Sequence, residues 1–558
     1  MKHSVLPLAL LALACGRAPE TRTYDVVVYG ATPGGVAAAV NAAREGVSTA
    51  LLQEDHHIGG LASGGLSNSD FRSFESLGGT FLEFTQRVKQ HYAAAHGPDS
   101  QQVVDSVEGG YYEPSVARKV FEEMLREAGV AVHVRHRLLA VSAEPSGERR
   151  RITQARFTDL ASGRPVEVSG RMFIDGTYEG DLLAQAGIAY HLGCESKAAY
   201  GESLAFDEEN RYVQTYNFRV CMSRSPANRI PLEKPSNYDR KEYAPLIGYL
   251  RDGVVDALDQ RTGAKPVLKV RPMANDKADF NDVWQSPISL SVENVNHPWP
   301  EGSPEVRQRI FNYYKDYSVG LLWFLTHDPE VPADWRAEMA QWGLPKDEYP
   351  ETGHWTPALY VREGRRMIGM RVFIEQDTQP EPGELRARLN PDAIAMADYS
   401  INCHGVWSAG PGQPSLGHLS KAIQPYQVPY GVLLSKDVDN FLAPVPMSAS
   451  HVGFAALRME PAWTAIGQAA GVAAAMSLKT GASLRALDVP TLQLRLHELG
   501  AKTVYVSDLG EAVERAAAVL GSAGQLRRHA QPRPAGGRAP VSRRAVVRHQ
   551  GLFPRPAG

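Results

Sequence analysis

The sequence predicts an α/β fold in which a three-layer, Rossmann-like domain with a parallel sheet carries an inserted α+β domain. Between residues 25 and 54, an apolar strand, a glycine-rich turn, a helix and a second apolar strand follow one another, which is the order of a parallel βαβ unit. This pattern stops near residue 192 and returns near residue 427, which predicts that one domain interrupts another. With 558 residues, the chain is long enough to form both domains.

The charge and cysteine content exclude several classes of protein. The chain has 59 Lys and Arg against 62 Asp and Glu, so it lacks the basic excess of nucleic-acid-binding proteins. No two of its four cysteines have the spacing of a metal site, and we therefore expect neither a metal centre nor an iron–sulfur cluster. The four are Cys15, Cys194, Cys221 and Cys403.

Residues 1–15 have the pattern of an export signal. A basic start precedes an apolar run over residues 5–14, which is too short to cross a membrane as a mature helix. Residues 12–14 fit a cleavage site, and the same residues followed by Cys15 resemble the lipobox of bacterial lipoproteins. We therefore expect an exported protein, either periplasmic or an outer-membrane-anchored lipoprotein, with membrane contact only through a lipid anchor at Cys15.

The C-terminal end has a different composition. Residues 481–520 are predicted to form a helical segment, whereas residues 521–558 contain eight arginines and no acidic residue. Because a stretch so rich in Pro, Gly and Ala cannot bury a core, we expect a disordered basic tail there.

The glycine-rich turn after the first strand has the features of a dinucleotide-binding site. Residues 25–29 form the predicted strand and residues 36–45 the predicted helix. Gly30 permits the tight turn, Gly35 lets the helix approach the strand, and free N–H groups at the helix start can hold a pyrophosphate. Glu54 ends the second strand and is placed to accept hydrogen bonds from a ribose. The turn residues assigned to the cofactor are Gly30, Thr32, Pro33, Gly34 and Gly35, with Thr32 at the position of the usual middle glycine.

A second motif of the same kind follows. A helix is predicted over residues 116–128, a strand over 130–134 and a hairpin over 152–174. The hairpin leads into a D-G-T turn that resembles a second cofactor motif, and a plain strand–helix turn capped by Asp181 is the alternative. A glycine-rich loop after Glu54 suits a cofactor longer than NAD. From these segments we assign to the cofactor site Gly59, Gly60, Val134, Asp175, Gly176 and Thr177.

With both motifs present, the chain resembles the FAD-dependent oxidoreductase family of the glutathione-reductase-like flavoprotein class, in the branch often found in exported bacterial proteins. The likeness covers residues 24–504. It is carried by the segments 27–35, 57–60, 173–181, 199–203, 216–219, 359–367, 449–451, 458–461 and 467–471. The resemblance implies FAD as cofactor, an FAD-binding domain formed by residues 24–191 and 427–480, and an inserted substrate domain of residues 192–426.

The last motif of the resemblance indicates where a reaction takes place. In this class the N-terminus of a late helix points at the flavin, and the resemblance gives that role to Glu460 and Pro461 at the start of the predicted helix 461–478. An Arg–Glu pair that caps a core helix is the alternative. His451 is the candidate general acid or base because imidazole titrates near neutral pH, and a structural histidine is the alternative. The catalytic candidates are His451, His404 and Arg458.

The inserted region leaves the substrate open. It holds seven of the eight tryptophans, which would stack on sugar rings if exposed and form a core if buried. Arg362, Arg365 and Arg366 fit either a clamp for an anion or a solvated helix face.

We expect hydride transfer to the flavin from an unidentified small-molecule substrate, with a glycan or other carbohydrate-related molecule as one hypothesis and an unknown electron acceptor. Two alternatives are an NAD(P)-linked dehydrogenase and a glycan-binding or lyase-like exported protein with a non-redox flavin.

Overall fold

The computed structural model describes residues 20–73, 76–381, 387–410, 413 and 415–504. The predicted export signal with Cys15, the predicted basic tail and residues 505–520 lie outside these ranges. In the part of the chain that is described, no helix is both long enough and apolar enough to cross a membrane.

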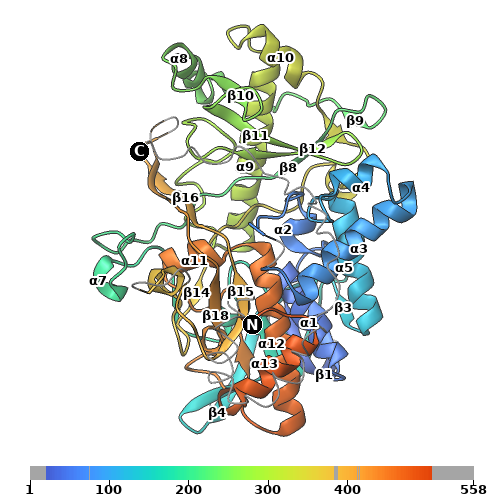
Figure 1. Ribbon diagram of the computed structural model, residues 1–558, viewed down its shortest axis with the longest axis vertical. Coiled ribbons are helices and arrows are strands. Elements are labelled where there is room, and N and C mark those ends of the chain that lie inside the picture. The colour runs from blue at the N-terminus through green and yellow to red at the C-terminus, as the bar shows by residue number, and fades with distance from the viewer. Residues whose placement is uncertain (1–19, 74–75, 382–386, 411–412, 414, 505–558) are drawn as a thin grey trace, which may run out of the picture. The chain divides into compact units, whose positions relative to one another are not determined.

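A seven-stranded sheet forms the centre of the dinucleotide-binding part (Figure 1). Five of its strands are parallel, and their order in the sheet is β3-β2-β1-β6, with β19 also beside β6. They are β1 (Glu20–Tyr29), β2 (Thr49–Leu52), β3 (Ala131–His133), β6 (Arg164–Asp175) and β19 (Phe441–Leu442). The apolar residues 26–29 of β1 are all buried, as expected for a central parallel strand.

Two further strands make the sheet mixed rather than wholly parallel. β4 (His136–Ser146) and β5 (Arg149–Asp159) run antiparallel to their neighbours and extend the sheet beyond β6. The α/β prediction is confirmed, and the parallel sheet needs this correction. The reason is that β4, β5 and β6 are joined by connections of only two and four residues, which are too short for a parallel crossover.

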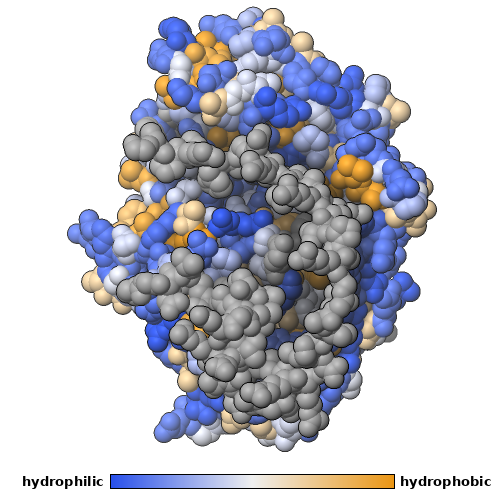
Figure 2. Space-filling view, viewed as in Figure 1, coloured by the Kyte–Doolittle hydropathy of each residue, from blue (hydrophilic) through white to orange (hydrophobic). Residues whose placement is uncertain are grey.

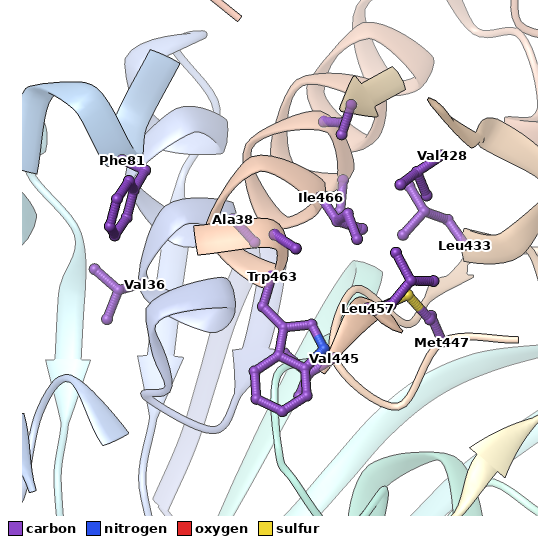
Figure 3. Packing of buried hydrophobic residues seen from close by; sticks show 14 of the residues in the cluster. Val36, Ala38, Phe81, Val428, Leu433, Val445, Met447, Leu457, Trp463 and Ile466 are labelled. Carbon is purple, nitrogen blue, oxygen red and sulfur yellow. The ribbon is translucent and has the colours of Figure 1, made fainter. Parts of the chain in front are cut away.

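Two helices of distant sequence pack tightly on one face of this sheet. The helices α1 (Pro33–Arg44) and α12 (Glu460–Thr480) meet at small residues, and Figure 3 shows the larger apolar side chains packed around them. A Cβ atom on Gly467 would lie 2.0 Å from the carbonyl oxygen of Gly34, so the backbones approach as closely as glycine allows. The predicted small-residue face of α12 therefore packs against α1.

Further helices complete this layer. α5 (Pro114–Ala128) ends at Gly129, which has a left-handed φ of 74°, and α3 (Gly79–His96) packs against both α5 and α12. On the opposite face of the sheet, a second apolar core includes the Phe157 ring of β5, centred 5.5 Å from the ring of Tyr29.

The inserted region has its own sheet and its own core. A four-stranded sheet in the order β10-β11-β12-β8 packs with the long helix α9, and their apolar side chains form a cluster within residues 213–361. The elements are β8 (Val220–Ser223), β10 (Ala257–Asp259), β11 (Pro266–Met273), β12 (Lys277–Asp282) and α9 (Pro304–His327). None of the seven tryptophans of the insert is exposed, so they serve the core and its edges.

The last part of the predicted insert packs with the dinucleotide-binding part instead. β15 (Ala393–Ala397) pairs with β18 (Tyr426–Pro429) and contacts α12, and both strands contribute to the core around α12. The residues that pack on α12 therefore begin before residue 427, where the second part of the FAD-binding domain was predicted to start.

The remaining elements are short. The helices are α2 (Gly60–Ser63), α4 (Gln101–Asp105), α6 (Asp181–Gln185), α7 (Lys197–Tyr200), α8 (Pro245–Arg251), α10 (Ala333–Met339), α11 (His451–Leu457) and α13 (Val489–Glu498). The strands are β7 (Tyr190–His191), β9 (Arg229–Ile230), β13 (Leu344–Pro345), β14 (Arg366–Met367), β16 (Ile401–Ser408) and β17 (Ser415–Lys421). Figure 2 shows hydrophilic residues over most of the visible, coloured face, with hydrophobic residues in scattered groups.

Candidate active site

The two predicted cofactor motifs meet at the carboxyl ends of β1 and β6. Gly30 has a φ of 100°, and a Cβ atom there would lie 2.6 Å from the backbone of Gly176 and of Thr177. A Cβ atom on Gly35 would lie 1.9 Å from the carbonyl oxygen of Gly30. Both glycines are therefore required by close backbone contact.

Thr32 explains the departure from the usual glycine pattern. Its Oγ1 donates to the carbonyl oxygen of Gly176 at 2.7 Å and accepts from the N–H of Gly35 at 3.2 Å. The side chain thus caps α1 and ties the first motif to the second, a role that a glycine could not fill.

A cavity of about 800 Å³ opens at this junction and reaches across to the inserted region. Its lining includes five of the predicted cofactor residues, namely Gly30, Thr32, Glu54, Gly60 and Thr177. The insert contributes side chains from α9 and from the loop before β14, among them Arg307, Lys315, Trp355 and Val361. The cavity is therefore bounded by both parts of the molecule.

Glu54 lies at the edge of this cavity with its side chain 36% exposed. Its Oε1 accepts a hydrogen bond from Nε of Arg137 at 2.8 Å. The neighbouring Gln53 accepts from the N–H of Ala31 at 2.8 Å. The two residues that follow β2 thus have different roles. Gln53 supports the glycine-rich turn, and Glu54 lies at the cavity.

Other predicted cofactor residues support the cavity without lining it. The buried carboxylate of Asp175 accepts from the N–H and hydroxyl of Thr177 and from the N–H of Leu183, which fixes the D-G-T turn. Burial raises the pKa of Asp175 to about 7. The predicted residues that are absent from the cavity lining are Pro33, Gly34, Gly35, Gly59, Val134, Asp175, Gly176, Glu460 and Pro461.

Asp181 has a role that the sequence did not reveal. The N-cap of α6 is Gly180, and the Asp181 carboxylate instead accepts two hydrogen bonds of 2.7 Å from Arg307 of α9 and one of 3.0 Å from Arg365. Beside this contact, Nε1 of Trp299 donates to Glu179 at 2.9 Å. These contacts join the second motif to the insert, and only the three-dimensional structure brings α9 to this turn.

The N-terminus of α12 carries a buried carboxyl group with a free oxygen. Tyr178 donates from its hydroxyl to Oε1 of Glu460 at 2.6 Å, and the N–H of Leu61 donates to the same hydroxyl at 2.9 Å. Oε2 of Glu460 has no hydrogen-bond partner among the described residues. Burial raises the pKa of Glu460 to about 8, so the group is protonated at neutral pH.

Arg458 does not pair with Glu460, which removes the helix-capping pair as an explanation for the two residues. Its guanidinium donates to the carbonyl and side-chain oxygens of Asn402 and, at 2.9 Å, to the hydroxyl of Tyr360. No salt bridge of the described residues includes Arg458, although its side chain is 1% exposed.

His451 lies at the start of α11 in a buried ionic cluster, away from the lining of the cavity. Nδ1 lies 3.0 Å from both carboxylate oxygens of Glu363, and the backbone N–H donates to Glu195. Burial opposes a charged imidazolium, but the sulfur of Cys194 and the carboxylate of Glu363 raise the pKa of His451 well above its usual range.

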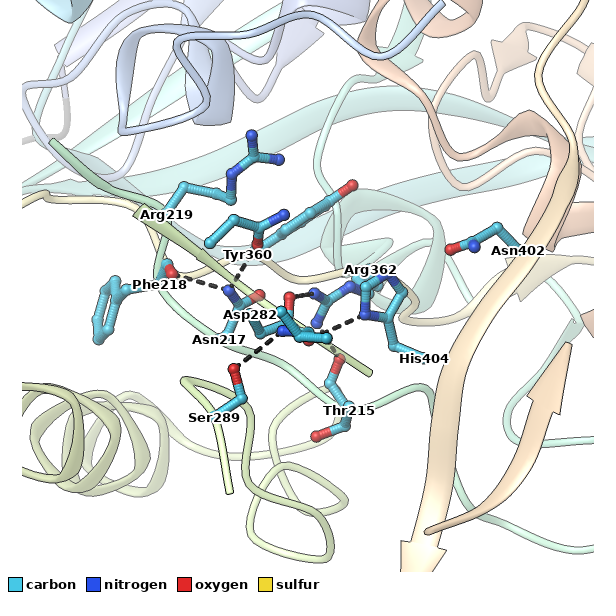
Figure 4. Close-up of polar contacts among 12 residues, drawn as sticks. Thr215, Asn217, Phe218, Arg219, Asp282, Ser289, Tyr360, Arg362, Asn402 and His404 are labelled. Atoms are coloured by element: carbon cyan, nitrogen blue, oxygen red, sulfur yellow. Dashed lines mark hydrogen bonds and ion pairs between the residues drawn. The ribbon is translucent and has the colours of Figure 1, made fainter. Parts of the chain in front are cut away.

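His404, which likewise does not line the cavity, forms a buried pair with Asp282 (Figure 4). Nδ1 lies 3.0 Å from Oδ2 of Asp282, whose Oδ1 accepts from Arg362 at 2.9 Å. Burial, together with the charge of Arg362, lowers the pKa of His404 to about 3, so the ring is neutral. A neutral ring that donates from Nδ1 to a carboxylate has its Nε2 free to accept a proton.

The arginines that follow Tyr360 are buried, so they do not form a solvated helix face. Arg362 pairs with Asp282, Arg365 with Asp181, and Arg366 with Glu195 and Glu363. They are internal counter-ions that hold the carboxylates of several segments in place.

The described residues contain no group of three or more His, Cys, Asp or Glu side chains arranged to hold a metal ion. Their three cysteines, Cys194, Cys221 and Cys403, are buried and form no disulfide.

The two glycine motifs and the cavity at their junction, with the late helix α12 packed on α1, define a dinucleotide-binding protein. The family model for FAD dependent oxidoreductase matches residues 25–496, and the chain belongs to this family. It is therefore an enzyme, and the residues at the cavity fit FAD, because the backbone contacts of Gly30 and Gly35 admit no side chain. Away from the cavity lining, the buried Oε2 of Glu460 has no hydrogen-bond partner among the described residues.

Several solved structures have a distant likeness to this chain. A geranylgeranyl bacteriochlorophyll reductase-like protein from Thermoplasma acidophilum is 12% identical with a TM-score of 0.32, and the alignment covers 91% of this chain and 90% of that one. THI4 from Thermovibrio ammonificans is 18% identical with a TM-score of 0.22, covering 31% and 67%. L-proline dehydrogenase from P. horikoshii is 18% identical with a TM-score of 0.17, covering 29% and only 24%. No curated protein sequence matches the chain significantly.

Proposed function

We propose that this enzyme removes a hydride from a carbon atom of a small-molecule substrate and that FAD, bound in the cavity of about 800 Å³, receives it. The observation that supports this most is the convergence of both dinucleotide motifs on one cavity that the insert also lines. The positive end of the α1 helix dipole would attract the pyrophosphate, although the N–H of Gly35 already donates to Thr32 and Pro33 has no N–H. Glu54 would accept hydrogen bonds from the ribose.

FAD, when bound, supplies the two-electron acceptor of the reaction and passes the electrons on to an acceptor. The protein supplies a proton acceptor and a positive potential. As the hydride leaves carbon, the proton of the adjoining hydroxyl or amine would go to Nε2 of His404, and Asp282 would stabilise the imidazolium that forms. With FAD bound near them, the N-terminus of α12 and Arg458 would supply a positive potential that favours negative charge on the cofactor.

The substrate and the location belong to this proposal too. The hypothesis of a carbohydrate-related substrate depended on exposed tryptophans that could stack on sugar rings. No tryptophan of the insert is exposed, and of these seven only Trp299 and Trp355 line the cavity. We therefore keep the substrate to a small molecule. Export, with or without a lipid anchor at Cys15, rests on the pattern of residues 1–15.

The test is an absorption spectrum of the purified protein, followed by anaerobic titration with candidate hydride donors. We expect a flavin band near 450 nm that bleaches with a substrate. A protein that binds only NAD(P) would lack the band, and a non-redox flavin would keep it with every donor; either result contradicts the proposal.

A matched pair of variants tests the binding site. In Gly30→Ala the new methyl group collides with the backbone of Gly176, and we expect at least a tenfold loss of FAD affinity. Gly46→Ala also places alanine at a positive φ, but nothing lies within 4 Å of its Cβ, so FAD should remain bound. Equal FAD content in the two variants would refute this position for the cofactor.

A further inference from the structure

We propose that the substrate carries a carboxylate, and that this group binds between the sheet of the insert and the segment that leads into α12. The inference rests on the proposed function, because it assigns the substrate class of the same enzyme. Three observations support the proposal. The two faces of the insert's sheet differ in polarity, buried positive charge exceeds buried negative charge, and some buried polar atoms have no hydrogen-bond partner among the described residues.

The two faces of the β8-β11-β12 sheet differ sharply. Leu268 and Val270 of β11 and Phe280 of β12 point into the core of the insert. The alternate positions are polar: Lys269 of β11 is opposite Asn281 of β12, and Arg271 is opposite Asp279. Because paired residues on neighbouring strands point to the same side, these side chains form one face, which we call the polar sheet face.

The polar sheet face contacts the loop that follows α2. Nη1 of Arg271 donates to Oδ1 of Asn68 at 2.6 Å. Arg219, just before β8, pairs with Asp279 and lies 3.7 Å from Asp70. The face is thus turned toward the dinucleotide-binding part, where a substrate has to meet the cofactor.

Positive charge exceeds negative charge at this contact. Four cations, namely Arg219, Lys269, Arg271 and Arg458, face three carboxylates, Asp70, Asp279 and Asp398, while Arg362 and Asp282 neutralise each other. Within the described residues, Lys269, Arg271 and Arg458 take part in no salt bridge. Glu460 adds no charge at neutral pH, since burial raises its pKa to about 8.

Such an excess is costly in a buried place unless an anion balances it. Burial lowers the pKa of Lys269, in keeping with an ammonium group that lacks a close counter-ion. A bound carboxylate would supply the missing negative charge, and Arg groups bind carboxylates in pairs of parallel hydrogen bonds.

Donors for such a group are already in place. The Tyr360 hydroxyl accepts from Arg458, so its own proton is free to be donated, and the guanidinium of Arg362 lies 4.5 Å from the Tyr360 ring centre (Figure 4). Nδ2 of Asn68 is buried without a partner among the described residues. Asn68 is 2% exposed, and its unused N–H groups lie beside Arg271.

The location is close to the expected redox centre. A cavity of about 20 Å³, which is room for about one water molecule, lies at the N-terminus of α12 and is lined by Asp70, Asp398, Tyr399, Met459 and Pro461 among others. None of its described lining residues is a cation, so the carboxylate would bind beside this cavity and not in it. The Tyr178–Glu460 hydrogen bond joins a residue of the large cavity to the residue next to Pro461. A carboxylate beside Arg458 would therefore fix a substrate near the position proposed for the flavin.

The experiment compares propionate with its neutral isostere propionamide, using the full-length, FAD-loaded protein and both calorimetry and the flavin difference spectrum. We expect propionate to bind and propionamide to bind at least tenfold more weakly. The half-buried side chains allow variants that fold: Arg271→Gln and Lys269→Met should each raise the propionate Kd at least tenfold. The control Arg211→Gln, at a side chain that is 75% exposed, should leave it unchanged.

Three results would overturn the assignment: no propionate binding, equal binding of propionamide, or a Kd unaffected by both variants. Inorganic phosphate serves as a further arm, and tighter binding of phosphate than of propionate would point to a phosphorylated ligand and contradict the carboxylate. If the purified protein contains no flavin and binds none, that result contradicts only the proposed function. Calorimetry can still measure propionate binding in that sample and so tests the carboxylate site separately.

Discussion

At the scale of single residues, the structure separates side chains of similar appearance by their surroundings. His451 and His404 are both buried and both lie beside a carboxylate. His451 is held in an ionic cluster with Glu363, whereas His404 is a neutral ring with an acceptor nitrogen. The sequence motif favoured His451 as the proton carrier, whereas the proposed function uses His404; neither histidine lines the cavity.

Glu460 gives a pH-dependent prediction. Its pKa is 4.5 when unfolded and about 8 in the structure, so the stability that the protonated group contributes is complete below pH 4.5 and is lost as the pH rises toward 8. Glu460→Gln keeps the amide neutral at every pH. We expect its stability relative to wild type to improve with rising pH, by roughly 1.4 kcal/mol for each pH unit between about 5 and 8.

Urea unfolding at a series of pH values measures this difference. The exposed Glu498→Gln serves as the control and should follow wild type at each pH. If Glu460→Gln also runs parallel to wild type, the carboxyl group is not protonated in the folded state.

At the scale of elements, the α1–α12 contact decides how the two ends of the dinucleotide-binding part join. The contact depends on glycine backbones that touch, and not on large side chains. It places the N-terminus of α12 next to the turn that begins α1, which is why the first and last motifs of the sequence share one site.

Gly467→Ala should therefore be strongly destabilising, because its Cβ would lie 2.0 Å from the Gly34 carbonyl oxygen. We expect a loss of about 2–3 kcal/mol in the free energy of unfolding, typical of overpacking in a core. Gly248→Ala is the matched control: it also lies inside a helix, α8, with nothing within 4 Å, and should stabilise by about 0.5–1 kcal/mol. Similar stabilities for both variants in urea would disprove the tight contact.

At the scale of the whole molecule, the insert and the dinucleotide-binding part close the cavity together. The Arg307–Asp181 pair is the strongest of their polar contacts at the cavity, since it has two parallel hydrogen bonds of 2.7 Å. Arg365 adds a third bond to the same carboxylate.

Arg307→Lys should weaken FAD binding, since an ammonium group cannot make the paired bonds that hold α9 against the second motif. We expect the FAD Kd to rise about tenfold, as measured by fluorescence of released flavin. Arg309→Lys, on an exposed side chain of the same helix, should have no effect. An unchanged Kd in Arg307→Lys would show that the pair does not support the cavity.

Much of the dinucleotide-binding part was readable from local pattern. The glycines at 30 and 35, the strand and helix that flank them, and the D-G-T turn all follow from short-range rules of strand burial and turn geometry. The antiparallel β4–β5 pair, the packing of β15 and β18 on α12, and the role of Asp181 were not readable. The role of Asp181 depends on Arg307, 126 residues away in the chain, and the β4–β5 pair depends on the direction of a strand. The position of β15 and β18 depends on their contact with the later helix α12, and periodicity carries none of this information.

The sequence by itself determined the class of fold, the family and the residues that cradle a dinucleotide, because these depend on glycines whose backbone contacts admit no side chain. The tertiary structure alone decided which carboxylate each histidine faces, which arginines are neutralised and which are left without a salt bridge. The physical reason is that the protonation state and the pairing of a buried charge depend on the groups around it. Those groups come from β12, β16, the loop after α2 and the start of α12.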